Sequence, residues 1–358
     1  MRAFKNLLVN EQIKALPFTK SIIKHFKNIP VAFFKPAEEQ NIIKKFNRAD
    51  VLLLTGLKGS FLKKCPGTTE YSCCNYYILN TEINCPFSCS YCILQDYFEL
   101  KAHVIYTDID ELLLHLPRQL KKLNKEKMRI GTGEFTDSLA LDNISGISLK
   151  LISFFKDYPH ILLELKTKSL NVGNLLTITP PGNIIVGWSV NTDKIIQKVE
   201  RNTPSLLKRL EAAQKLAQAG YKLSFHFDPI IFYEEMEKDY KKVIDLIYRY
   251  VPAEKISWIS LGCLRFTKGL MQSFFKKSPG FIDEFIVGDD NKLRYLRPRR
   301  VRAYKTITGR IKKYNPEQFI YLCMESQTVW KQVFGFSFET NEDFEKWFND
   351  HVFEKQRS

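Results

Sequence analysis

From about residue 76 onward, short runs rich in β-branched and aromatic residues alternate with longer stretches in which apolar residues recur every three or four positions. The short runs are typical of buried strands, and the periodic stretches are typical of helices that cover a sheet. Their alternation indicates parallel strands joined by crossover helices. Six such runs suit a partial or complete α/β barrel. The predicted strands are Tyr76–Glu82, Arg129–Glu134, Leu162–Lys166, Ile184–Val190, Lys222–Asp228 and Trp258–Leu261.

The clearest helical pattern covers Thr203–Gly220, where leucines and alanines repeat at i, i+3 and i+4 spacing. Residues typical of helix boundaries mark both ends of this pattern. Thr203 can cap the first turn, Pro204 suits a first helical position, and Gly220 is a typical terminator.

The flanking segments are less regular. Residues 264–358 contain two predicted helices, near Pro298–Tyr314 and Asn341–Phe353, and the chain has no internal repeat or low-complexity tract. We therefore expect an N-terminal extension over residues 1–70, a barrel core over 71–263 and a basic C-terminal region over 264–358.

Composition narrows the class of protein. The 358 residues are 44% hydrophobic and 26% charged, with a formal net charge of +15, as in an ordinary globular protein. No apolar stretch approaches the roughly 20 residues of a membrane-spanning helix, and the mildly basic N-terminus lacks the apolar run of a cleaved signal. We therefore expect a cytoplasmic protein that does not associate with a membrane.

Six of the eight cysteines crowd between Cys65 and Cys92. Three of them, Cys85, Cys89 and Cys92, have C-x3-C-x2-C spacing directly after the first predicted strand, so one loop can aim three sulfurs at one point. Thiolates favour iron–sulfur clusters and zinc. Three ligands would leave one iron of a [4Fe–4S] cluster open to a small molecule. A zinc or buried-thiol site remains the alternative, with Cys65, Cys73, Cys74 or His103 as a fourth ligand.

The motif, with an aromatic residue just before its last cysteine, resembles the radical S-adenosylmethionine superfamily. The resemblance implies a partial (β/α)6 TIM-type barrel, with Cys85, Cys89 and Cys92 holding three irons. It also implies that S-adenosylmethionine chelates the fourth iron and is cleaved to a 5′-deoxyadenosyl radical. Thr132-Gly133-Glu134 matches an element that accepts hydrogen bonds from the cofactor's ammonium. Glu134 can alternatively be a strand-end carboxylate paired with a lysine.

Within the superfamily, the chain is most similar to the spore photoproduct lyase family. This resemblance implies that Lys168 and Ser189 contact the cofactor's carboxylate and that Asn191 lies near its ribose. A solvated lysine and a structural strand hydroxyl are the alternatives for the first two. The matching stretches are Ser90-Tyr91-Cys92-Ile93-Leu94-Gln95, Phe135-Thr136-Asp137-Ser138, Thr167-Lys168, Trp188-Ser189-Val190-Asn191, Arg209-Leu210-Glu211-Ala212-Ala213 and Ala219-Gly220-Tyr221-Lys222-Leu223.

The chain departs from this family where a thiol should return a hydrogen atom to the substrate radical. The corresponding stretch, residues 133–137, contains no cysteine, and Ile93 replaces the tyrosine expected after the last cluster cysteine. Tyr91 remains as a candidate catalytic residue. Cys263, at the end of the sixth predicted strand, would face the same mouth as the cluster and is the alternative hydrogen donor, unless it is a small buried hydrophobe.

The sequence leaves the roles of the upstream cysteines and of one histidine open. Cys65, Cys73 and Cys74 can bind a second metal, form a redox pair or be buried thiols. Adjacent cysteines in an extended segment point to opposite faces, so at most one of Cys73 and Cys74 should readily join Cys65. His226 can bond substrate at the barrel mouth or be a satisfied core histidine.

A basic stretch from Lys292 to Lys313 carries ten Lys and Arg residues interleaved with tyrosines. Guanidinium groups suit phosphates, and aromatic rings stack on bases. Together with a pI of about 9.3, the stretch predicts a DNA-binding surface, although Lys and Arg can simply solvate a face. The resemblance adds an electron donor such as flavodoxin or ferredoxin as a second partner.

The leading hypothesis is a radical S-adenosylmethionine lyase that repairs thymine photolesions in DNA. A lesion must leave the base stack to reach a cluster in the barrel, and damage lowers that cost. One alternative is a radical enzyme that acts on RNA, a nucleoside or a peptide. Another is a non-catalytic zinc or iron–sulfur module that binds nucleic acid.

Overall fold

The main sheet of this computed structural model contains eight strands in the order β18-β14-β13-β11-β10-β9-β5-β4. The structure describes residues 4–46, 50–68, 70–98, 102–281 and 283–354. All six predicted strands are confirmed as consecutive parallel neighbours. Their bounds are β5 Tyr77–Leu79, β9 Met128–Gly131, β10 Ile161–Thr167, β11 Ile184–Ser189, β13 Lys222–Ile230 and β14 Ile256–Cys263.

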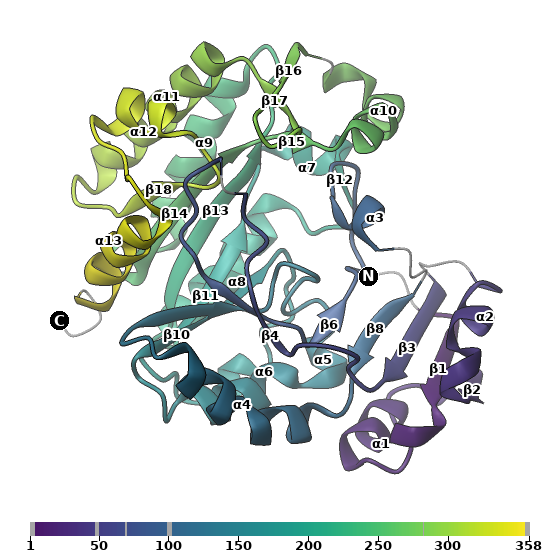
Figure 1. The fold of residues 1–358 in the computed structure, drawn as a ribbon. Helices are drawn as coiled ribbons and strands as arrows, with labels where there is room; N and C mark the ends of the chain where they lie inside the picture. Colours follow the sequence, from purple (N-terminus) through teal and green to yellow (C-terminus); the bar gives the residue numbers. More distant parts are fainter. Residues whose placement is uncertain (1–3, 47–49, 69, 99–101, 282, 355–358) are drawn as a thin grey trace.

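The sheet curls into a partial barrel, which confirms the predicted fold class (Figure 1). Its strands are largely buried on both faces; every residue of β11 is buried, as is common for parallel strands covered by helices. Amphipathic helices lie outside the curve, each with one buried stripe. They include α4 Ile109–Leu123, α6 Ile147–Phe155, α8 Leu206–Gln218, α9 Met236–Tyr250 and α11 Arg297–Tyr314.

Both edges of the barrel sheet come from the flanking segments. Strand β4, Leu62–Lys64, pairs antiparallel with β5, and β18, Ile320–Leu322, pairs parallel with β14. The sheet therefore draws strands from both sides of residues 70 and 263, where the sequence suggested boundaries.

The N-terminal segment is more regular than expected. Strands β1 Asn6–Asn10, β2 Val31–Phe34 and β3 Val51–Thr55 form a parallel sheet. Strand β8, His103–Tyr106, continues it, and β6, Glu82–Ile83, closes its edge antiparallel. The expectation of an irregular extension was wrong because these strands are short and separated by helices of only five to seven residues, α1 Pro17–Ile23 and α2 Glu39–Ile43.

Three predicted helices are confirmed, with one correction at an end. Helix α8 begins at Leu206 after Ser205, so Thr203 is not its cap; its hydroxyl instead donates to the Glu200 carbonyl. Helix α11 and α13, Asn341–Glu354, match their predictions within one residue. No helix of the described segments is long and apolar enough to cross a membrane.

The remaining helices and strands are short and lie outside the two large sheets. They are β7 Ser88–Cys89, α3 Leu94–Tyr97, α5 Asp142–Ser145, α7 Asp193–Lys198, β12 Glu200–Arg201, β15 Arg265–Phe266, α10 Lys268–Lys277, β16 Phe285–Val287, β17 Leu293–Tyr295 and α12 Gln327–Phe334.

Candidate radical S-adenosylmethionine site

The three-cysteine motif forms a loop between β6 and α3, at the end of the barrel where active sites of this architecture are built. Its middle, β7, pairs antiparallel with β12, so that Cys89 lies opposite Glu200 and Ser88 lies opposite Arg201. The Gln95 side chain donates to the Cys89 carbonyl at 2.6 Å. The middle of the loop is therefore held both by β12 and by the residue that follows the last cysteine's turn, Gln95.

The three thiols lie close enough to influence one another. Burial raises the pKa of Cys85, and Cys92 and Cys89 raise it further. Burial likewise raises the pKa of Cys89 to about 12, with Lys168 acting in the opposite direction. Cys89 is buried and Cys85 and Cys92 are partly exposed, and neighbouring thiols of this kind are a donor set that positive metal centres would stabilise as thiolates. The residues present therefore fit a cluster.

A single metal ion is the alternative ligand for these thiols. In the described part of the chain, no three His, Cys, Asp or Glu side chains are arranged to hold one metal ion. A single zinc draws its thiolates to about 2.3 Å from one point. A [4Fe–4S] cluster ligates a different iron with each thiolate and so holds the sulfurs further apart. His103, a candidate fourth ligand, lies in β8, with its ring 5.3 Å from that of Phe4.

A buried polar network holds the cysteine loop against the barrel. The Tyr91 hydroxyl donates to Glu200 at 2.6 Å, and the other carboxylate oxygen of Glu200 accepts from Arg209 at 2.6 Å. Arg209 also donates to the Ser189 carbonyl and to the Thr203 hydroxyl. Although burial disfavours the charge, Arg209 and Lys168 keep the pKa of Glu200 below its usual value. An ionised Glu200 thus links Tyr91 to the end of β11.

Lys168 lies at the centre of this arrangement. It follows β10, and its backbone N–H donates to Asp137 at 2.6 Å. Its ammonium lies 5.9 Å from the centre of the Tyr91 ring. Burial lowers the pKa of Lys168, but Glu200 and Cys89 outweigh this effect and raise it overall. Lys168 is therefore a half-buried cation beside the cysteine loop.

The structure places Thr132, Gly133 and Glu134 directly after β9, at the same end of the barrel. The Thr132 hydroxyl donates to Ser138 at 2.7 Å. Gly133 lies so close to Lys166 that an added Cβ would be 2.7 Å from that side chain. Glu134 forms an ion pair with Lys166. Burial raises the pKa of Glu134, but Lys166 more than offsets this effect, so the pKa lies below its usual value. The alternative of a lysine-paired strand-end carboxylate therefore describes Glu134 here.

Ser189 and Asn191 close strand β11 in different ways. Ser189 is buried, and its carbonyl accepts from Arg209 at 3.0 Å. The Asn191 amide donates to the Pro229 carbonyl at 2.9 Å and accepts from Tyr240 at 2.7 Å. Asn191 is thus committed to joining the ends of β11 and β13, and its role near a ribose stays a prediction.

Cys263 does not lie where the sequence suggested. Burial raises the pKa of its thiol, which lies near Glu325 and hydrogen-bonds Tyr304 of the outer helix α11. Its neighbour Gly262 instead faces Asp228, to which an added Cβ would be 2.8 Å away. Alternation along β14 therefore turns Cys263 toward the helices and away from the cysteine loop.

His226 is held as a satisfied core histidine. Its Nε2 lies 2.7 Å from Glu164 and its Nδ1 lies 2.7 Å from the Ser260 hydroxyl, and the ring is buried. Although burial acts in the opposite direction, His226 lowers the pKa of Glu164 to about 2. This pair belongs to the polar interior of the barrel.

The upstream cysteines gather beside the barrel. Cys73 hydrogen-bonds both Cys65 and Cys74, and Arg129 donates to the Cys74 sulfur at 2.6 Å. Cys73 is thus the member of the adjacent pair that joins Cys65. A second metal at these thiols stays a prediction.

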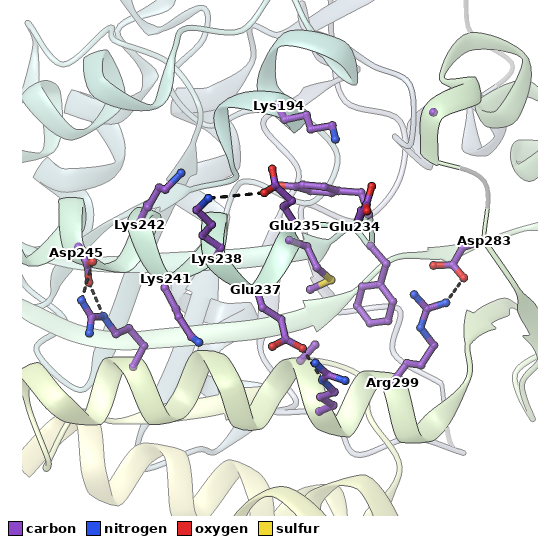
Figure 2. A pocket seen from close by; sticks show the side chains of 17 residues that line it. Lys194, Glu234, Glu235, Glu237, Lys238, Lys241, Lys242, Asp245, Asp283 and Arg299 are labelled. Atoms are coloured by element: carbon purple, nitrogen blue, oxygen red, sulfur yellow. Dashed lines mark hydrogen bonds and ion pairs between the residues drawn. The ribbon is translucent and has the colours of Figure 1, made fainter.

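Carboxylates pair with several cations of the basic stretch, and its role as a DNA surface stays a prediction. Figure 2 shows part of it, beside a hollow of about 1070 Å³ between α9 and α11. There, Arg302 pairs with Glu237 at 2.6 Å. Six of the ten cations form ion pairs: Lys292 and Arg294 with Asp290, Arg299 with Asp283, Arg300 with Glu325, Arg302 with Glu237, and Arg310 with Asp245.

Sequence reasoning missed the two carboxylates that organise the site. Glu200 lies in an irregular stretch between two helices, and only its partner Arg209 belonged to a matching motif. Asp137 belonged to a matching stretch but had no predicted role; it accepts from the Thr167 hydroxyl and the Lys168 N–H, both at 2.6 Å. A buried Arg on a helix that is otherwise apolar on that face is the signal that points to such a carboxylate.

Comparisons with known proteins agree with this geometry. A family model described as "Spore photoproduct lyase" matches residues 34–285. Spore photoproduct lyase of Clostridium acetobutylicum is 22% identical over 250 residues, which are 67% of this chain and 73% of that protein. The Bacillus subtilis protein is 28% identical over 222 residues, which are 61% of this chain and 64% of that protein.

Solved structures of spore photoproduct lyase share the fold. One, complexed with a dinucleoside spore photoproduct, superposes with a TM-score of 0.76 at 21% identity, covering 89% of this chain and 98% of its own. A double mutant with bound AdoMet and the same dinucleoside has a TM-score of 0.76 at 20% identity, covering 90% and 99%. The match of the family model over most of the chain means that this protein belongs to the spore photoproduct lyase family of radical S-adenosylmethionine proteins.

Proposed function

We propose that this protein binds a [4Fe–4S] cluster through Cys85, Cys89 and Cys92 and uses S-adenosylmethionine to repair thymine photolesions in DNA. The observation that carries the proposal is the cysteine loop, tied by Tyr91, Glu200 and Arg209 to the end of the partial barrel. When bound, the cluster supplies the electron that cleaves the sulfonium bond of the cofactor.

The residues around the loop have separate tasks in binding the cofactor. Lys168 is the cation that would hold the cofactor's carboxylate, because it lies beside Cys89 and stays charged. Ser189 at the end of β11 would add a hydroxyl contact. Thr132, Gly133 and Glu134 would accept hydrogen bonds from the ammonium group; Gly133 makes room for the Lys166 side chain, and Lys166 holds Glu134 ionised.

Tyr91 is a positioning residue in this scheme. Its hydroxyl is committed to Glu200, so it orients the loop beside the third cysteine. Burial and Glu200 raise its pKa well above the usual value, so the phenol stays protonated. The DNA would approach the open end of the barrel, where a damaged thymine step could leave the stack at reduced cost. The protein would work in the cytoplasm with an electron donor such as flavodoxin or ferredoxin.

Anaerobic reconstitution tests this proposal. We expect a brown protein with about four irons per chain, which cleaves S-adenosylmethionine to 5′-deoxyadenosine with dithionite and releases thymine from a dinucleoside spore photoproduct. A colourless zinc protein without cofactor cleavage would instead identify a non-catalytic nucleic-acid-binding module.

One observation favours a second candidate, a radical enzyme of the same family with another substrate. Residues 133–137 contain no cysteine to return a hydrogen atom, and the Cys263 thiol lies against Tyr304. Cofactor cleavage without thymine release would select this candidate. Deuterium transfer into 5′-deoxyadenosine from labelled RNA, nucleoside or peptide would then identify the substrate class.

A further inference from the structure

The outer side of the cysteine loop reaches the protein surface at the β7–β12 ribbon. Alternation along β12 turns Glu200 inward to Tyr91 and leaves Arg201 exposed. Arg201 lies opposite Ser88, which is also exposed and directly precedes Cys89. Lys168 follows a barrel strand and so approaches the loop from the other side. The ribbon is therefore a surface next to the cluster cysteines and separate from the barrel interior.

Hydrogen bonds connect this surface to the loop. Gln95 donates to the Cys89 carbonyl at 2.6 Å and accepts from the Lys277 ammonium at 3.0 Å. Arg201 donates to the Lys277 carbonyl at 3.2 Å, and so joins β12 to the end of α10. A partner that contacts Arg201 and Lys277 would therefore be two hydrogen bonds from a cluster ligand.

The charges around this surface are almost all positive. Residues 193–210 contain two carboxylates, the exposed Asp193 at the far end of α7 and the buried Glu200 paired with Arg209, and residues 267–281 contain none. These segments expose a group that we call the basic face. It consists of Lys198, Arg201, Lys276 and Lys277. No carboxylate of the described residues forms an ion pair with any of these four, in contrast to the paired cations of α11.

We propose that the basic face docks a small acidic protein that carries a low-potential one-electron cofactor. This inference rests on the proposed function, because an oxidised cluster must receive one electron from outside before it can cleave the cofactor. In the step, the donor's cofactor would lose one electron, and a cluster held by Cys85, Cys89 and Cys92 would accept it, with no bond made and no proton moved. Electron transfer slows steeply with distance, and complementary charges speed encounter, so a basic surface beside Cys89 suits an acidic donor.

Charge reversal on the reconstituted protein tests this docking site. The variant combines Lys198→Glu, Arg201→Glu and Lys276→Glu and leaves Lys277 to Gln95. A matched control reverses three exposed lysines on other elements, Lys24→Glu, Lys156→Glu and Lys331→Glu. Flavodoxin is the probe. Its Kd is measured by calorimetry, and the rate at which its hydroquinone reduces the cluster is measured by stopped-flow absorbance.

We expect the basic-face variant to lose about tenfold or more in both affinity and reduction rate. The control should stay within about twofold of the unmodified protein, and dithionite should support equal cofactor cleavage in all three. If the variant loses iron, Arg201→Gln and Lys276→Gln replace it. Each should then flatten the fall of the reduction rate with ionic strength.

Unchanged flavodoxin affinity and reduction rate in the variant would overturn the proposal. So would a loss of duplex DNA binding with flavodoxin binding intact, because the basic face would then serve nucleic acid. Failure of the unmodified protein to cleave S-adenosylmethionine with dithionite would reject the proposed function instead, and the calorimetric comparison would still decide whether the face binds an acidic protein.

Discussion

The pair formed by Arg209 and Glu200 offers the sharpest test of what holds the cysteine loop. The side chains are 0% and 1% exposed, respectively, and the bond between them is 2.6 Å long. Arg209→Met keeps much of the buried volume but leaves Glu200 without its closest cation and leaves the Ser189 carbonyl and Thr203 hydroxyl without their donor. Breaking one side of a buried ion pair costs about 3–5 kcal/mol of unfolding free energy.

The measurement is urea unfolding of the apoprotein, followed by iron analysis after reconstitution. The control is Arg302→Met, which removes a bond of the same length to Glu237 from a pair whose side chains are 77% and 32% exposed. An exposed pair contributes at most about 1 kcal/mol. We expect the Arg209 variant to lose both stability and iron, since Glu200 also fixes Tyr91. Equal stability of the two variants, with full iron content, would refute the idea that this network anchors the loop.

Three further predictions concern ligands and pH. Replacing Cys85, Cys89 or Cys92 by Ala should remove most of the iron and abolish cofactor cleavage, whereas Cys65→Ala and Cys73→Ala should keep about four irons per chain; elemental analysis distinguishes them, and loss of iron on Cys65→Ala would indicate a metal there. Lys168→Met should raise the KM for S-adenosylmethionine about tenfold or more in the dithionite assay, because it removes a charge-assisted hydrogen bond; an unchanged KM would exclude that contact. Burial, with Asp142 and Asp137, raises the pKa of Glu82 from 4.5 to about 8, so folding favours its neutral form, and this contribution is complete below pH 4.5 and lost as the pH rises through 8. Urea unfolding of Glu82→Gln between pH 5 and 9 should show a flatter decline than the unmodified protein, and parallel curves would contradict the assignment.

The barrel was predictable because its strands are buried on both faces. Continuous apolar runs such as β11 can be recognised without knowing their neighbours. The N-terminal sheet was not recognised, because its strands are only four or five residues long and the sheet is completed by β8, which pairs with β3 and lies beyond the cysteine loop. The start of α8 was misplaced for a related reason. Thr203 is a residue type that often caps helices, but its hydroxyl donates to the Glu200 carbonyl instead.

Within the site, spacing alone revealed the ligands but not what holds them. C-x3-C-x2-C places three sulfurs on one loop wherever the loop lies. Glu200 and Asp137 act on Tyr91 and Lys168 through contacts that span 109 and 31 residues of sequence, so no local pattern can indicate them. Cys263 shows the opposite case. It lies at the end of a strand as predicted, but side chains alternate along β14, and its thiol therefore faces the outer helix rather than the cysteine loop.

The distribution of charge shows the same dependence on tertiary structure, because a run of cations in the sequence does not reveal which of them are paired with carboxylates. Helix α11 is basic along its length, yet its cations meet carboxylates of α9 and of neighbouring loops, so much of its charge is cancelled within the protein. Much of the excess of Lys and Arg that gives the net charge of +15 therefore lies on other parts of the surface. The basic face contributes only four cations, two from the adjacent elements α7 and β12 and two from α10, but none of them is paired with a carboxylate of the described residues. A long-range attraction depends on unpaired charge. Unpaired lysines and arginines beside the cysteine loop can therefore attract an acidic partner, whereas half of the cations of α11 are already paired with carboxylates.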